Sequence, residues 1–199
     1  MSTGRPRTPR ILRRRALFPL LLFCLADSGC ASSAEPAHPQ TAFLTSLARH
    51  CGRAYAGRII QRPAGDRLFR GDERLVVHFR ECSDDQLKLP FHVEANRSRT
   101  WILTRTDSGI DLRHDHRHAD GSPDETTMYG AHTRTEGAAA RQEFLRPRGP
   151  DGVVSGWAIE IVPGQRYTYG TIRDGEWRYR LDFDLTTPIE APPPPWGHR

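Results

Sequence analysis

Hydrophobic and polar positions alternate along most of the chain with the period of two that β-strands have. In the clearest case, EWRYRLDFDL at 176–185, charged residues separate the apolar positions Trp177, Tyr179, Leu181, Phe183 and Leu185. This alternation is typical of a strand with one face against a core and the other against water. Weaker versions predict further strands at 54–61, 75–81, 87–94, 100–106, 110–116, 125–130, 157–162 and 167–172.

Turn-forming sequences such as PAGD, DSG and RDGE separate the predicted strands, and no stretch between them suits a helical crossover. We therefore predict a mainly β fold, either a single antiparallel β-barrel or a sandwich, of about 9–10 strands. One short helix is expected first, because Thr41 can cap a segment whose apolar residues recur at helical spacing: Phe43, Leu44, Leu47 and Ala48. A helix leading into such a series resembles the calycin barrels, although CGRAYAG at 51–57 lacks the tryptophan of true lipocalins.

The composition suits one exported domain better than a nucleic-acid-binding protein. A length of 199 residues, with 37% of them hydrophobic, is enough for a single domain with its own core. The formal net charge of +5 would point to nucleic acid if the folded domain carried it. Residues 1–29, however, contain six arginines and one acid, which account for the whole net charge. We therefore predict no nucleic-acid partner.

The basic start is followed by the apolar run ALFPLLLFCLA at 16–26 and then by small residues, which is the pattern of a signal peptide over 1–29. This run is interrupted by Pro19 and is too short for a membrane span, which needs about 20 apolar residues. Arg14 and Arg15 suit the twin-arginine pathway, but the general export pathway accepts the same residues. We expect a periplasmic or outer-membrane location, or secretion.

Two processing sites fit the end of this signal. LADSGCASS resembles the lipobox of bacterial lipoproteins, with Cys30 as the lipidated residue, but Asp27 stands where the family prefers an aliphatic residue. Ordinary signal-peptidase cleavage after Ala34 is the alternative. In both cases a flexible tether over 30–40 precedes a β domain at 41–190, and the protein would reach a membrane through its lipid anchor only.

After processing, the domain keeps Cys51 and Cys82. In an oxidising compartment we expect this pair to form a disulfide, which would close a loop of about 30 residues and stabilise the fold by about 3 kcal/mol. The alternative, a catalytic cysteine, requires a reduced thiol beside a base.

The stretch APPPPWGHR at 191–199 predicts a proline-rich tail in the polyproline II conformation. In a cytosolic protein such a segment could bind an SH3 or WW domain. Behind an export signal we instead expect a stiff strap that Trp196 fixes to the barrel.

Three histidines at alternate positions stand out in RHDHRHADGSPDETTMYG at 113–130. A turn at 120–123 would pair His118 with Glu125, His116 with Thr127 and His114 with Tyr129. The same face continues backwards through the apolar Leu112, so the histidines are expected to point inward at the mouth of the barrel.

Three hypotheses fit this face. His114 and His116 can chelate one divalent metal ion such as Zn²⁺, with His118, Glu125 or His132 as third ligand, in a site of hydrolase type. The side chains can instead form a hydrogen-bonded polar rim. They can also line a small-molecule pocket with Trp101, Tyr129 and Trp157. No H-E-x-x-H, C-x-x-C or G-x-S-x-G motif accompanies them.

Five motifs together, FLTSLARHCGRAYAG, RECSDD, RSRTW, HDHRHADG and PPPPWGH, resemble a group of uncharacterised exported bacterial proteins, secreted or lipidated, over almost the whole mature chain. The resemblance implies export and a single domain, and no activity. Two functions follow. We favour a non-catalytic envelope protein whose β domain binds a small molecule or an envelope component. The alternative is a metal-dependent hydrolase that uses His114 and His116.

Overall fold

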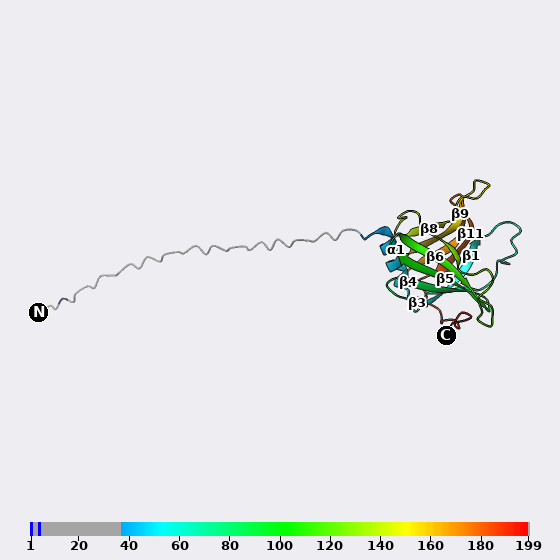
Figure 1. The fold of residues 1–199 in the computed structure, drawn as a ribbon. Coiled ribbons are helices and arrows are strands. Elements are labelled where there is room, and N and C mark those ends of the chain that lie inside the picture. The colour runs from blue at the N-terminus through cyan, green and yellow to red at the C-terminus, as the bar shows by residue number, and fades with distance from the viewer. Residues whose placement is uncertain (2–3, 5–36, 199) are drawn as a thin grey trace. The chain divides into compact units, whose positions relative to one another are not determined.

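The computed structural model describes residues 1, 4 and 37–198 (Figure 1). Nearly all of the predicted signal peptide, the lipidation site Cys30 and most of the tether lie outside the described residues. One helix, α1 (Pro39–Ala48), precedes the strands. These are β1 (Ala54–Gln61), β2 (Leu75–His78), β3 (Glu81–Cys82), β4 (Gln86–Val93), β5 (Asn96–Thr106), β6 (Gly109–His116), β7 (Tyr129–His132), β8 (Arg141–Leu145), β9 (Ser155–Val162), β10 (Arg166–Arg173) and β11 (Glu176–Asp184).

The strands form one antiparallel sheet in the order β7-β6-β5-β4-β2-β1-β11-β10-β9-β8, with β3 paired to β4 outside this path. The sheet curls until its two end strands meet, and one isolated bridge, Thr133–Phe144, joins the β7 side to β8. We call this junction the seam. The prediction of a mainly β fold after one short helix is confirmed, and the architecture is a nearly closed barrel and not a sandwich.

Two strand predictions need correction, and one strand was not predicted. The segment 75–81 is interrupted after His78 and continues as the short β3, while the strand expected at 125–130 begins only at Tyr129. Strand β8 was not predicted at all. Its alternation is hidden because Gln142, a polar residue, occupies a fully buried position, where its amide donates to the carbonyls of Glu136 and Ala138.

The apolar face predicted for 176–185 does not extend to Trp177. The pairing of β10 with β11 shifts between Thr171 and Ile172, so that Trp177 pairs with Ile172 while Tyr179 pairs with Thr171. This bulge turns Trp177 out of the barrel, and its ring lies under the guanidinium of Arg141, 5.0 Å away. The alternation predicted from Tyr179 to Leu185 is retained.

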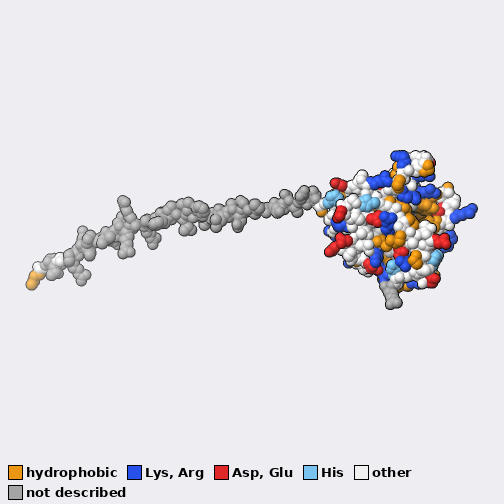
Figure 2. All heavy atoms as spheres, viewed as in Figure 1, with side chains coloured by type: hydrophobic (Ala, Val, Ile, Leu, Met, Phe, Trp, Pro, Cys, Tyr) orange, Lys and Arg blue, Asp and Glu red, His pale blue; other side chains and the backbone are white. Residues whose placement is uncertain are grey.

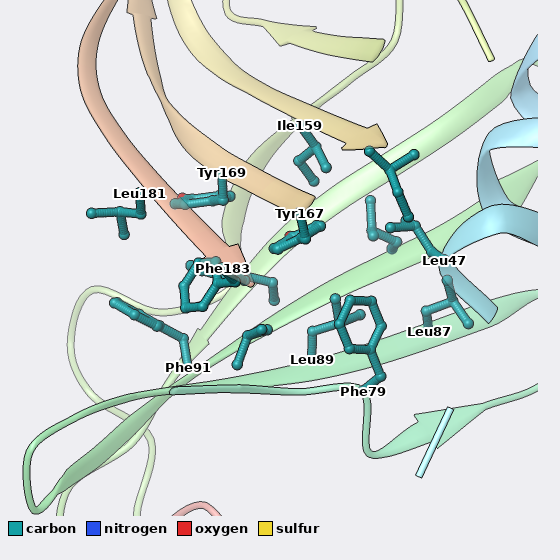
Figure 3. Close-up of a cluster of buried hydrophobic side chains, with 14 of the residues drawn as sticks. Leu47, Phe79, Leu87, Leu89, Phe91, Ile159, Tyr167, Tyr169, Leu181 and Phe183 are labelled. Atoms are coloured by element: carbon teal, nitrogen blue, oxygen red, sulfur yellow. The ribbon is translucent and has the colours of Figure 1, made fainter. Parts of the chain in front are cut away.

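The helix α1 packs on the core and is tied to the barrel by a disulfide. It begins at Pro39 and not at Thr41, because a proline is favoured in the first turn of a helix. Its Leu47 belongs to the same buried cluster as Phe79, Leu87 and Leu89 (Figure 3). The predicted disulfide between Cys51 and Cys82 is formed and joins the chain just after α1 to β3.

The residues after β11 lie along the outside of the barrel and form what we call the strap, residues 186–198. The Ile189 amide donates to the Ala54 carbonyl, and the Trp196 amide donates to the Arg97 carbonyl. Beyond Trp196, the imidazole of His198 lies 3.2 Å from the Asp115 carboxylate. The part of the expected proline-rich tail that the structure describes is therefore docked on the strands. Within the described residues, no helix has the length and apolar character required to cross a bilayer.

Candidate functional site

A cavity of about 150 Å³ lies inside the barrel, between the walls formed by β4–β7 and by β9–β11. It brings together the predicted pocket residues Trp101, Tyr129 and Trp157 with His114 and His116. Its remaining lining is Leu68, Phe69, Phe91, Arg99, Tyr169, Gly170, Thr171, Tyr179 and Leu181. Larger hollows elsewhere, such as one of about 700 Å³ beside Arg58, lie on the surface and are lined mostly by polar and charged residues. We therefore place the candidate site in the aromatic cavity.

Aromatic rings stacked on one another build the walls of this cavity. Trp101 stacks on Tyr169 with 3.8 Å between ring centroids, and on its other side Phe91 follows at 4.7 Å. Tyr169 and Leu181 lie on neighbouring strands, with Phe91 on the opposite wall (Figure 3). His114 stacks on Tyr129 at 4.8 Å. These mutual contacts fix the ring positions, so the cavity keeps its shape without a ligand.

His114 is held in one neutral tautomer. Its Nδ1 lies 3.1 Å from the Tyr129 carbonyl oxygen, which can only accept, so Nδ1 carries the proton. Its Nε2 therefore accepts from the Tyr169 hydroxyl, 2.6 Å away. Burial lowers the pKa of His114 to about 4, despite the opposing effect of the Tyr129 carbonyl. Both ring nitrogens are thus occupied, and the ring is uncharged at neutral pH.

His116 shares the inward face but lies nearer the mouth of the cavity. Its Nε2 lies 3.1 Å from the hydroxyl oxygen of Tyr129. Burial is the main cause that lowers the pKa of His116, and the positive charge of Arg99 acts in the same direction. Burial also raises the pKa of the Tyr129 hydroxyl. This pair is therefore neutral near pH 7.

A set of hydrogen bonds to the Asp66 carboxylate, which we call the clamp, fixes the loop between β1 and β2 over the cavity. The Asp66 carboxylate accepts from the backbone amides of Leu68 and Phe69, and from the Tyr179 hydroxyl at 2.5 Å. The hydrogen bond from Tyr179 is the largest cause that lowers the pKa of Asp66. This clamp buries Phe69 against the cavity and leaves Leu68 more than half exposed at its rim.

The histidine hairpin turns earlier than the sequence predicts. His114 pairs with Tyr129 as expected, but the His118 amide donates to the Ser122 carbonyl, because Asp120 accepts from the Ser122 amide and hydroxyl and tightens the turn. The surplus residues form an irregular segment that ends at Met128, whose φ is 55°. His118 and Glu125 are consequently both exposed and not paired with each other.

The residues of the metal hypothesis are therefore not all brought together. His114 and His116 are neighbours, whereas His118 and Glu125 lie on the exposed hairpin tip. His132 lies at the other end of β6, opposite Asp111, and is bonded to Ser108. Within residues 37–198, no three His, Cys, Asp or Glu side chains are placed to hold a metal ion.

Arg99 is a site residue that the sequence patterns did not single out. The strand predicted at 100–106 starts four residues after the strand in the structure, since β5 begins at Asn96. Arg99 has the same parity as Trp101 and Leu103, so a longer strand would have placed it inside. Tyr169 and Thr171 were likewise missed as lining residues, although their strand was predicted.

Comparisons with known proteins provide no further guidance: no family model, no curated protein and no solved structure matches this chain.

Proposed function

We propose that this protein is an exported, non-catalytic binding protein that holds a small molecule in the aromatic cavity of its barrel. The observation that supports this most directly is the cavity itself: it is lined by rings fixed in stacks, with few polar groups, as ligand-binding sites commonly are. The hydrogen bonds of His114 to Tyr129 and Tyr169 act as structural links in the wall and leave neither nitrogen free for proton transfer or a metal.

The size of the cavity limits the ligand. A cavity of about 150 Å³ matches the volume in which an engineered apolar site binds benzene. A single ring or a group of similar volume therefore fits, whereas a long acyl chain would have to extend out of the mouth. The exposed Leu68 at the rim offers an apolar surface for such an extension.

Export is the second part of the proposal. It is supported by the signal-like leader and by the Cys51–Cys82 disulfide, which is typical of oxidising compartments. We propose that Cys30 is lipidated and that the domain acts in the periplasm, attached to a membrane. If so, full-length protein will be in the membrane fraction and a Cys30→Ser variant in the soluble fraction. Membrane retention of the variant would refute lipidation.

The ligand-binding proposal is tested by titrating the purified domain with benzyl alcohol and with indole while recording tryptophan fluorescence and calorimetric heats. We expect saturable binding of one molecule per chain, because Trp101 and Trp157 line the cavity. A Thr171→Phe variant, which fills the cavity from β10, should lose this binding. Thr187→Phe makes the same change at an exposed position and should retain it. Absence of saturable binding for every ring-sized probe would refute the proposal.

A further inference from the structure

Arg99 is a cation inside an aromatic cavity without a counter-ion. It lies on the inward face of β5, where it pairs with Phe91 of β4 and His116 of β6. Its side chain is half-buried, and burial lowers its pKa, although a guanidinium remains protonated. Within the described residues, no carboxylate lies within 4.0 Å of its guanidinium, and the guanidinium makes no hydrogen bond. Its donors are therefore available to a molecule in the cavity.

The neighbours of Arg99 do not neutralise it. His114 and His116 are uncharged near pH 7, and the hydroxyls of Tyr129 and Tyr169 have raised pKa values. The negative charge of Asp124 reaches Arg99 only from beyond ion-pair distance. Acidic and basic side chains are interspersed over the surface in view in Figure 2, but Arg99 is the single formally charged residue in the cavity lining. The cavity thus has a local positive potential.

A second polar group in the lining also lacks a partner. The Thr171 hydroxyl oxygen is buried and has no hydrogen-bond partner among the described residues. Buried hydroxyl groups without a partner cost free energy, and a polar ligand atom would remove that cost. Thr171 lies on β10 and Arg99 on β5, so the two groups belong to opposite walls. Each wall of the cavity therefore offers a ligand one polar contact in addition to the aromatic surface.

We propose that Arg99 recognises a carboxylate, and that the ligand of the barrel is a small aromatic carboxylate whose ring packs among Trp101, Tyr129 and Trp157. This inference rests on the proposed binding function and assigns its ligand class. A guanidinium presents two parallel N–H groups that match the two oxygens of a carboxylate. The stacked rings supply the flat apolar surface that a single aromatic ring needs. An uncharged ring would leave the Arg99 guanidinium without an anion.

The test compares two probes of nearly equal size, benzoate and benzyl alcohol, by isothermal titration at pH 7. The wild-type domain should bind benzoate at least about tenfold more tightly, which is the contribution expected of a hydrogen-bonded charge pair. Arg99→Gln should weaken benzoate by a similar factor and change benzyl alcohol less than about twofold. Arg58→Gln removes the same charge from an exposed position outside the cavity lining and should change neither affinity.

Each other outcome has a definite meaning. If benzyl alcohol binds as well as benzoate, or if Arg99→Gln leaves benzoate binding intact, the carboxylate assignment is wrong while the binding function stands. If neither probe binds, the binding function itself is wrong. Should Arg99→Gln fail to fold, Arg99→Lys keeps the charge without the paired donors, and it should weaken benzoate severalfold and spare benzyl alcohol.

Discussion

Two histidines, His114 inside the barrel and His92 on its outer face, are equally buried but differ in their hydrogen bonds. We therefore expect them to contribute differently to stability. Each side chain is 2% exposed, and burial lowers the pKa of each to about 4. The ring of His114 makes two hydrogen bonds, to Tyr129 and Tyr169. In contrast, Nε2 of His92 has no hydrogen-bond partner among the described residues. His114 is thus integrated into a network, whereas His92 is only covered.

The strap contacts Arg97, a residue whose charge acts on His92. His92 alternates with the inward-facing Phe91 and therefore points out of the barrel, where the positive charge of Arg97 helps to lower its pKa. The guanidinium of Arg97 donates to the carbonyl of Pro194, and its own carbonyl accepts from the Trp196 amide. The strap thus contacts a residue whose charge acts on His92, and we expect the strap to help exclude water from this outward-facing ring. The strand pattern alone would leave this outward-facing ring exposed, so its burial requires a tertiary contact.

The largest effect that we expect is a loss of stability in acid. In the unfolded chain a histidine takes up a proton near its ordinary pKa of 6.5, while His114 and His92 in the folded protein remain neutral until about pH 4. The unfolded state therefore binds more protons between these values, and the free energy of unfolding falls as the pH decreases through this range. Each shift corresponds to on the order of 3 kcal/mol. Urea denaturation at several pH values between 7 and 4 measures the fall.

Burial also lowers the pKa values of His50, His78 and His116, so the decline should be steeper than for one group. A His92→Leu variant provides the control, since it lacks one of the two strongly shifted groups and should lose less stability in acid. A free energy of unfolding that stays constant from pH 7 to 4.5 would contradict the burial of these rings in solution.

A matched pair of substitutions separates the two histidines at neutral pH. His114→Leu leaves the buried Tyr169 hydroxyl without its acceptor and removes a stacked ring, so it should destabilise the fold by about 2–3 kcal/mol. His92→Leu replaces a ring whose Nε2 has no partner with an apolar side chain, so it should be neutral or stabilising by up to about 1 kcal/mol. Urea unfolding at pH 7.5 compares both with the wild type. Equal destabilisation by the two changes would show that the hydrogen bonds of His114 contribute nothing.

The smallest expected effect concerns the strap alone. Trp196→Ala should loosen the segment beside Arg97 and admit water to His92, which raises the pKa of His92 towards 6.5. The pKa of His114, which lies inside the barrel, should not change. Proton chemical shifts of the two imidazole rings, followed against pH, measure both values in one sample. An unchanged pKa of His92 would mean that other residues cover it.

Local patterns predicted the parts of this molecule that depend on neighbours in the sequence. The strand alternation, the helix with Leu47 and the inward direction of His114 all follow from residue spacing. The disulfide followed from the compartment that the leader indicates. The predicted pairing of His114 with Tyr129 is also found, although the turn lies elsewhere than predicted, because the irregular segment before Tyr129 takes up the surplus residues. These features form the frame of the candidate site.

The remaining features depend on bulges, turns and long-range contacts, which the spacing of residues along the sequence does not predict. A bulge moved Trp177 to the outer wall, and a tight Asp120 turn separated His118 from Glu125. Arg99 is a candidate ligand-binding residue because β10, on the opposite wall, carries no acidic residue that could pair with it. The sequence of β5 alone does not show this. His92 is buried although its strand position faces outward, and Arg97, whose charge acts on it, contacts the strap 97 residues further along the chain. Each of these positions is determined by tertiary contacts.

The seam gives ligand binding a mechanical consequence. Tyr129 lies on β7 and Trp157 on β9, on opposite sides of the junction that the Thr133–Phe144 bridge joins. A molecule that packs against both rings in the cavity would link the two sides of the seam, and it would slow the local opening through which backbone amides of β7 and β8 exchange with solvent. By mass action this effect would increase with ligand concentration, so that a barrel with bound ligand would open locally less often than an empty one.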